Sequence, residues 1–129
     1  MIAHVALETA PVDRRAATEF WIALGFVAVD PPPSLRDRAA WLERDGTQIH
    51  LLWTDEPAVA PDGHVAVVVP DYPAILERLR AAGHTVEPRT EHWGSPRAFT
   101  RAPGGHRVEL MAAPPVSARL ASPDPTASS

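Results

Sequence analysis

Four titratable residues stand at matching places in the two halves of the chain. His4 begins the run HVAL, His64 begins HVAV, His50 lies within QIHLL, and Glu109 lies within RVELM. The offset is 60 residues between the first two and 59 between the last two. Imidazole nitrogens and a carboxylate, without thiolates, suit Zn²⁺, Ni²⁺, Co²⁺, Mn²⁺ or Fe²⁺. The pattern therefore indicates a site for one divalent metal ion, and the sequence does not choose among these five.

Each of the four residues lies in a short apolar run that predicts a β-strand. These runs span residues 2–8, 47–53, 63–69 and 106–112. Side chains alternate between the two faces of a strand. In all four runs the aliphatic residues fall on one face and the titratable residue on the other. We therefore expect the aliphatic faces to lie under helices and the four titratable side chains to share the opposite face.

The same repeat predicts the fold. Helices are expected at 12–24 and 72–83, and each is closed by a glycine. Further strands are expected at 26–30, 38–46, 84–88 and 97–102, with a hairpin turn at Asp45-Gly46. The order corresponds to an α+β fold of two tandem βαβββ modules, about 1–56 and 62–112. Residues 113–129 have the composition of a flexible tail.

Composition excludes several classes of function. The chain has 129 residues, a length typical of one domain, with 45% hydrophobic and 22% charged residues and a net charge of −4. No basic stripe indicates nucleic acid, and no apolar run approaches the ~20 residues of a membrane span. The chain has no cysteine, so disulfides and thiolate sites are excluded. The first residues do not have the pattern of a signal peptide, so we expect a cytoplasmic protein.

Several motifs together resemble the vicinal oxygen chelate superfamily, the group of glyoxalase I, fosfomycin-resistance thiol transferases, extradiol dioxygenases and bleomycin-resistance proteins. The motifs are HVAL (4–7), FWIALGF (20–26), IHLL (49–52), GHVAVVV (63–69) and GGHRVEL (104–110). The resemblance covers residues 2 to about 112. It implies two modules that form a cup-shaped mixed sheet, with helices on the outer face and a metal ion inside.

The resemblance also implies roles for single residues. Glyoxalase-type ligand positions fall on His4, His50, His64 and Glu109, although many glyoxalases have glutamate where His50 stands. Fosfomycin-type enzymes use only the positions of the other three. By the same resemblance Glu109 is the catalytic residue, a ligand that can leave the metal and take a proton. Glu8 shares a strand face with His4 and is a second candidate base.

A further resemblance concerns the substrate. The stretch EHWGSPRAF (91–99) is similar to the WG…REF segment of bleomycin-resistance proteins, in which an aromatic residue and an arginine line a drug-binding groove. Trp93, Arg97 and Phe99 are therefore expected to bind substrate. Trp41, in the middle of its predicted strand, is expected to line the cup as well.

Two functions are compatible with these features. The first is a metal-dependent glyoxalase-like enzyme, an isomerase, lyase or thiol transferase that chelates a small oxygen-bearing substrate. The second is an antibiotic-resistance protein of bleomycin-resistance type that sequesters a drug or natural product. Family resemblance implies a homodimer with two cups, each built either within one chain or from modules of both chains.

Overall fold

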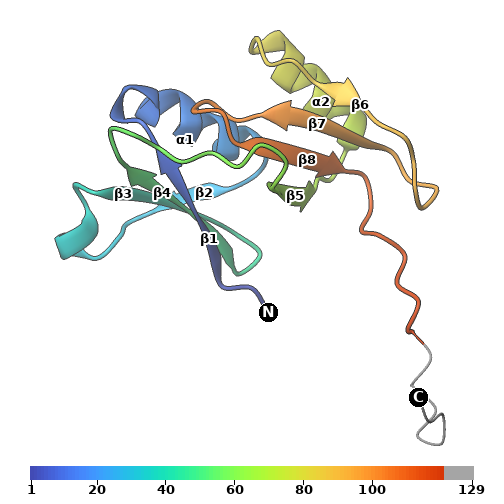
Figure 1. Ribbon diagram of the computed structural model, residues 1–129, viewed down its shortest axis with the longest axis horizontal. Coiled ribbons are helices and arrows are strands. Elements are labelled where there is room, and N and C mark those ends of the chain that lie inside the picture. Colours follow the sequence, from blue (N-terminus) through green and yellow to red (C-terminus); the bar gives the residue numbers. More distant parts are fainter. Residues whose placement is uncertain (121–129) are drawn as a thin grey trace, which may run out of the picture.

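The computed structural model describes residues 1–120 and contains two four-stranded mixed sheets (Figure 1). Module 1 comprises β1 (His4–Thr9), α1 (Arg14–Ala23), β2 (Val27–Val29), β3 (Ala39–Arg44) and β4 (Thr47–Trp53). Module 2 comprises β5 (His64–Val68), α2 (Tyr72–Ala81), β6 (Glu87–Pro88), β7 (Arg97–Arg101) and β8 (Arg107–Met111). The strand orders, β1-β4-β3-β2 and β5-β8-β7-β6, are the same in both sheets. This repetition confirms the predicted α+β fold of tandem βαβββ modules.

Backbone preferences explain the ends of several elements. Asp45 and Gly46 both have positive φ, 51° and 81°, which is the geometry of a tight turn between antiparallel strands and places β3 beside β4. Gly25 and Gly83 follow the helices with φ of 95° and 94°, as a C-terminal glycine cap requires. Pro11–Asp13 forms a short 3-10 helix, so α1 begins two residues later than the predicted 12.

The strand register determines which side chains of neighbouring strands lie next to each other on one face of the sheet. The first strand of each module runs parallel to the last one, so β1 pairs with β4 and β5 pairs with β8. The last strand also pairs antiparallel with the preceding strand, which sets Trp41 opposite His50 and Phe99 opposite Glu109. Residues opposite each other in a ladder share a face of the sheet. Each titratable residue in the last strand therefore has an aromatic neighbour on its own face.

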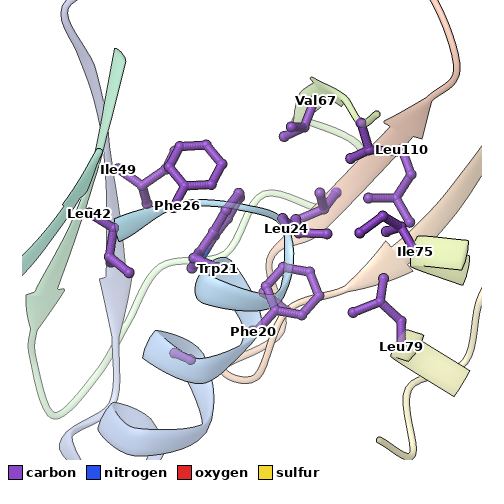
Figure 2. Packing of buried hydrophobic residues seen from close by; sticks show 14 of the residues in the cluster. Phe20, Trp21, Leu24, Phe26, Leu42, Ile49, Val67, Ile75, Leu79 and Leu110 are labelled. Atoms are coloured by element: carbon purple, nitrogen blue, oxygen red, sulfur yellow. The ribbon is translucent and has the colours of Figure 1, made fainter. Parts of the chain in front are cut away.

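The hydrophobic core joins the two modules through α1. Phe20, Trp21 and Leu24 are each at most 2% exposed. Figure 2 shows Trp21 lying toward Leu42, Ile49 and Phe26 of module 1, and Phe20 and Leu24 pointing toward Ile75 and Leu79 on α2. The aliphatic residues of both sheets complete the cluster; they include Leu51, Val67, Val108 and Leu110. Because these faces are used for packing, the titratable residues lie on the opposite face of each sheet.

The structure differs from the predictions in how the two sheets are joined and in the length of one strand. The sheets are open and separate, so within one chain they do not join into a single cup-shaped sheet. The strand expected at 84–88 is reduced to Glu87–Pro88. Residues 113–120 contain no helix or strand, and the rest of the predicted tail, 121–129, lies outside the described residues. Neither helix among residues 1–120 has the length and apolarity needed to cross a bilayer.

The position of Trp21 predicts a large stability effect. Replacing this fully buried indole by alanine should lower the free energy of unfolding by about 3–5 kcal/mol, because it leaves a cavity in the core that α1 forms with module 1. Ile22→Ala is the matched control, since Ile22 is the next residue on α1 and is 47% exposed; its loss should stay below about 1 kcal/mol. Denaturant unfolding measures both. Equal losses for the two variants would show that Trp21 is not buried in the core as described.

Candidate functional site

A stack of three aromatic rings covers the titratable face of module 1. The Trp41 indole lies 4.1 Å from the His50 ring with an angle of 2° between their planes. The His4 ring lies on the other side of His50, at 4.0 Å and 12°. The three residues come from three adjacent strands, β3, β4 and β1. The register sets Trp41 opposite His50, and it sets His4 opposite Gln48, which is two residues from His50 and on the same face. His50 is buried as a result, at 8% exposure, whereas His4 at the sheet edge is exposed.

Hydrogen bonds fix the tautomer of His50. The amide nitrogen of Gln48 donates to Glu43 Oε1 at 3.0 Å, so Gln48 Oε1 is free to accept a hydrogen bond. It lies 2.7 Å from His50 Nε2, which therefore carries a hydrogen. In the neutral ring the lone pair is then on Nδ1. Burial lowers the pKa of His50 below its ordinary value of 6.5, and the nearby His4 lowers it further, so the neutral ring is favoured.

A different arrangement occupies module 2, where Glu109 is buried between two nitrogen groups. His64 Nε2 lies 3.1 Å from Glu109 Oε1, and Arg97 Nη1 donates to Oε2 at 3.3 Å. The other ring nitrogen of His64, Nδ1, lies 2.9 Å from the carbonyl oxygen of Asp62. A carbonyl only accepts hydrogen bonds, so Nδ1 carries a hydrogen and Nε2 faces the carboxylate. Either a proton or a cation must then lie between Nε2 and Oε1, since both atoms otherwise present lone pairs.

Three of the four predicted substrate-binding residues lie together, and two of them, Arg97 and Phe99, adjoin Glu109. The Arg97 guanidinium lies 5.7 Å from the Trp93 ring centroid and 5.3 Å from that of Phe99. The edge of Phe99 meets the His64 ring at 5.0 Å and 88°. The Trp93 indole nitrogen is buried without a hydrogen-bond partner in the described part of the chain. The fourth residue, Trp41, lies in module 1.

The four predicted metal ligands form two pairs in the chain. His4 and His50 are neighbours in module 1, and His64 and Glu109 are neighbours in module 2. Among residues 1–120, no three side chains of His, Cys, Asp or Glu lie close enough to hold a metal ion together. The stacked rings of His4 and His50 are nearly parallel, so their in-plane nitrogen lone pairs do not converge. The assignment of all four as ligands to one ion stays a prediction.

Other polar residues have structural contacts. Glu8, the second candidate base, accepts a hydrogen bond from the backbone nitrogen of Ala58 at 2.8 Å and so holds the segment between the modules. His106 Nε2 lies 2.6 Å from the Glu8 carbonyl oxygen and joins the β7–β8 turn to β1. His84 packs edge-on against Phe20 at 5.3 Å.

Sequence reasoning did not single out three residues near these pairs. Gln48 holds His50, and Arg89 and Arg107 lie over Phe99, with guanidinium carbons 5.9 and 3.9 Å from its ring centroid. Strand alternation could have indicated two of them. Gln48 is two residues from His50, and Arg107 is two residues from Glu109, so each shares a face with a predicted ligand.

Comparison with known proteins gives a consistent assignment. The sequence model of the Glyoxalase/Bleomycin resistance protein/Dioxygenase superfamily matches residues 2–110. No curated protein sequence matches the chain. A glyoxalase family protein from Bacillus anthracis is similar in structure, with a TM-score of 0.76 and 21% identity, covering 86% of this chain and 93% of that one.

Two further solved structures have the same fold. Lactoylglutathione lyase from Agrobacterium tumefaciens has a TM-score of 0.65 and 22% identity, over 86% of this chain and 92% of that one. TnmS3, an antibiotic binding protein from Streptomyces sp. CB03234, has a TM-score of 0.65 and 21% identity, over 86% and 93% of the two chains. The family match extends over nearly all of the described residues, and the strand order repeats in both modules. The chain therefore belongs to the Glyoxalase/Bleomycin resistance protein/Dioxygenase superfamily.

Proposed function

We propose that the chain is a subunit of a divalent-metal-dependent glyoxalase-like enzyme that acts on a small oxygen-bearing molecule. The observation that carries this proposal is the pair formed by His64 and Glu109. The imidazole is oriented by the Asp62 carbonyl, and its Nε2 faces a buried carboxylate at 3.1 Å. A carbonyl on the far nitrogen of a histidine is a common support for a metal ligand, because it fixes the tautomer and the ring orientation.

The donor set of module 2 fits a divalent ion. His64 Nε2 and Glu109 Oε1 are separated by 3.1 Å, a distance that either a hydrogen bond or shared coordination of one cation would allow. A cation between them would also resolve the contact between two lone pairs. His64 and Glu109 are therefore the residues that would hold the metal ion, and Zn²⁺, Ni²⁺, Co²⁺, Mn²⁺ and Fe²⁺ all accept these donors.

The residues around the pair have separable roles in the proposed reaction. When bound, the metal ion supplies a Lewis acid that polarises substrate oxygen atoms. Glu109 is the candidate group to take a proton from the substrate, as a ligand carboxylate that can leave the metal ion. Arg97 keeps Oε2 hydrogen-bonded and so holds the carboxylate in one orientation. Phe99 and Arg97 limit access of water, since Phe99 is 9% exposed and the Arg97 side chain is 12% exposed.

A second copy of the chain would complete the site. Catalytic metal sites commonly use three protein ligands, and the described part of one chain brings only two together at Glu109. An apolar groove of about 630 Å³ runs along β1 and β5, with Val5 and Val65 among its lining residues. Ile2 and Val68, which also line it, are 69% and 39% exposed. We propose that a homodimer covers this surface and places His4 of one chain, with His50 behind it, beside His64 and Glu109 of the other.

Sequestration of a drug or other natural product is the second candidate function. Trp93, Arg97 and Phe99 lie together, and the Trp93 indole N–H has no acceptor among the described residues. A planar ligand with an acceptor atom would satisfy that N–H. In this case Arg97 would neutralise Glu109 in place of a metal ion. The antibiotic-binding protein TnmS3, which has the same fold, makes this function chemically reasonable.

Metal content distinguishes the two functions. Protein incubated with Ni²⁺, Zn²⁺ or Mn²⁺ and then desalted should retain about one ion per chain. Glu109→Gln and His64→Asn should each weaken metal binding at least tenfold, because each removes one of the few donors. Glu19→Gln is the matched control, since Glu19 is an exposed carboxylate on α1 and should bind metal as wild type does.

The same measurement can contradict the enzyme proposal. If wild-type protein retains none of the divalent ions tested, the proposal of a metal-dependent enzyme is wrong. Tight binding of a planar antibiotic by that metal-free protein, lost in Trp93→Ala, would support sequestration instead.

Mixing two variants tests whether the site forms across the dimer. His4→Asn removes a donor of module 1 and Glu109→Gln removes one of module 2, so each homodimer would have two damaged sites. If the sites combine modules of two chains, co-expression should restore roughly a quarter of the wild-type metal content, because half the dimers are mixed and each has one intact site. No recovery in a sample shown to contain mixed dimers would place all ligands of a site within one chain.

The lowered pKa of His50 predicts a change of stability with pH. In the unfolded chain the ring takes a proton as the pH falls through 6.5, while in the folded chain it takes one only at lower pH. The contribution of His50 to the free energy of unfolding is therefore fully present above pH 6.5. It is lost as the pH falls from 6.5 toward the lower pKa of the folded state. Denaturant unfolding in EDTA, between about pH 7.5 and pH 5.5, should show a smaller loss for His50→Asn than for wild type.

His92→Asn is the control for that experiment, because His92 is exposed at the surface of the loop before β7. Its loss of stability over the same range should match that of wild type. If His50→Asn loses as much stability as wild type, burial of a neutral His50 is the wrong explanation.

A further inference from the structure

A pocket lined by arginines lies beside the Glu109 pair in module 2. It has a volume of about 620 Å³ and is bounded by β7, β8 and the segments around residues 61 and 84–89. Arg89, Arg101 and Arg107 all line it, together with Phe99. Asp62 and Glu87 also line it, so three arginines face two carboxylates and the lining has a small net positive charge in a chain whose net charge is −4.

The guanidinium groups of two of these arginines lie near the ring of Phe99. The guanidinium carbon of Arg107 lies 3.9 Å from the centroid of the Phe99 ring, which places the cation directly against the ring. Arg89 lies 5.9 Å from the same centroid. An arginine held against an aromatic ring loses less conformational freedom when it binds a ligand, and its planar group offers two parallel N–H donors to a carboxylate or phosphate. The pocket is therefore prepared for an anion.

The acidic partners of these arginines are at the surface and are easily displaced. Arg107 Nη1 lies 3.6 Å from Asp62 Oδ1, and the Asp62 side chain is 96% exposed. Arg89 pairs with Glu87 at 2.9 Å, and both side chains are about half exposed. Exposed ion pairs of this kind contribute little to stability. Arg101 donates to the carbonyl oxygen of Gly105 and has no carboxylate partner among residues 1–120.

The pocket is connected to the proposed metal pair through Phe99. One side of this residue contacts the His64 ring at 5.0 Å, and in the strand register it lies opposite Glu109. Arg107 is two residues from Glu109 on β8 and faces the same side of the sheet. A molecule with its anionic end at Arg107 can therefore extend past Phe99 toward Glu109.

We propose that this pocket binds the anionic group, a carboxylate or a phosphate monoester, of a small organic molecule, with Arg107 and Arg89 as its principal donors. The identification of that molecule with the substrate rests on the proposed function, whereas the anion site itself does not. The substrate class would then be an organic acid or phosphate ester that presents its oxygen atoms to Glu109 and its charged end to Arg107.

Binding of simple anions to metal-free protein tests the site separately from the enzyme. In EDTA, inorganic phosphate and succinate are titrated against labelled protein and followed by amide NMR shifts, with neutral succinamide as the uncharged probe. We expect saturable shifts at Phe99, Thr100 and Arg107 with at least one of the two anions, and none with succinamide. Phosphate alone would indicate a phosphate ester, and succinate alone a carboxylate.

Variants give the residue-level test. Arg107→Met keeps an apolar side chain on Phe99 while removing the charge, and it should weaken anion binding at least tenfold. Arg107→Lys keeps the charge but not the paired donors, and it should bind at an intermediate level. Arg15→Gln, an exposed arginine on α1, is the control and should bind as wild type does.

The proposal is overturned if neither anion gives saturable shifts in folded wild-type protein, or if the shifts spread equally over exposed arginines such as Arg15. It is also overturned if Arg107→Met, folded as judged by its amide spectrum, binds as tightly as wild type. Since the titration uses metal-free protein, loss of the proposed enzyme function would leave its result unchanged.

Discussion

Packing of α1 between the two sheets is the constraint on which the rest of the structure depends. Phe20 and Leu24 reach α2 while Trp21 contacts module 1, so this helix joins the cores of both modules. The aliphatic face of each sheet must turn toward the helices to exclude water. Strand alternation then leaves the titratable residues on the opposite faces, where they are covered mainly by each other and by aromatic neighbours. The two polar faces are therefore consequences of the core.

The two faces differ in chemistry although they come from the same repeat. In module 1 His50 is held between Trp41 and His4, and its lowered pKa favours a neutral ring. In module 2 the corresponding residue is Glu109, which needs charged partners when buried. Arg97 and His64 provide them. The histidine of module 1 and the glutamate of module 2 thus have different surroundings, stacked rings in one module and a charged network in the other.

Much of the fold could be predicted because each element has a local cause. Asp45-Gly46 specifies a hairpin, Gly25 and Gly83 end helices, and the alternation around His50 and Glu109 specifies strands with one apolar face. The partition of each sheet's faces follows from the same alternation. The separation of the two sheets could not be predicted in this way, because it depends on how α1 packs against α2, which no local pattern encodes.

The site was predicted less completely than the fold. Residue type and spacing pointed to His64 and Glu109, and the resemblance to bleomycin-resistance proteins pointed to Arg97 and Phe99; the structure brings these four side chains together. Side-chain conformations could not be predicted from the sequence. The stacking of His4 on His50 depends on their rotamers, and so does the placement of Arg107 over Phe99, although the strand position of Arg107 could be predicted. The same limit applies to Gln48, whose bond to His50 determines which ring nitrogen has a lone pair.

The proposed enzyme requires that His64 and Glu109 hold a divalent ion that a second chain helps to bind. Anomalous diffraction from crystals of Ni²⁺-loaded protein would locate such an ion. We expect one peak per chain within ligand distance of His64 Nε2 and Glu109 Oε1, with His4 of a neighbouring chain as a third ligand. Crystals of loaded protein with no peak at this pair, or with nickel bound only at surface histidines such as His92, would contradict this expectation.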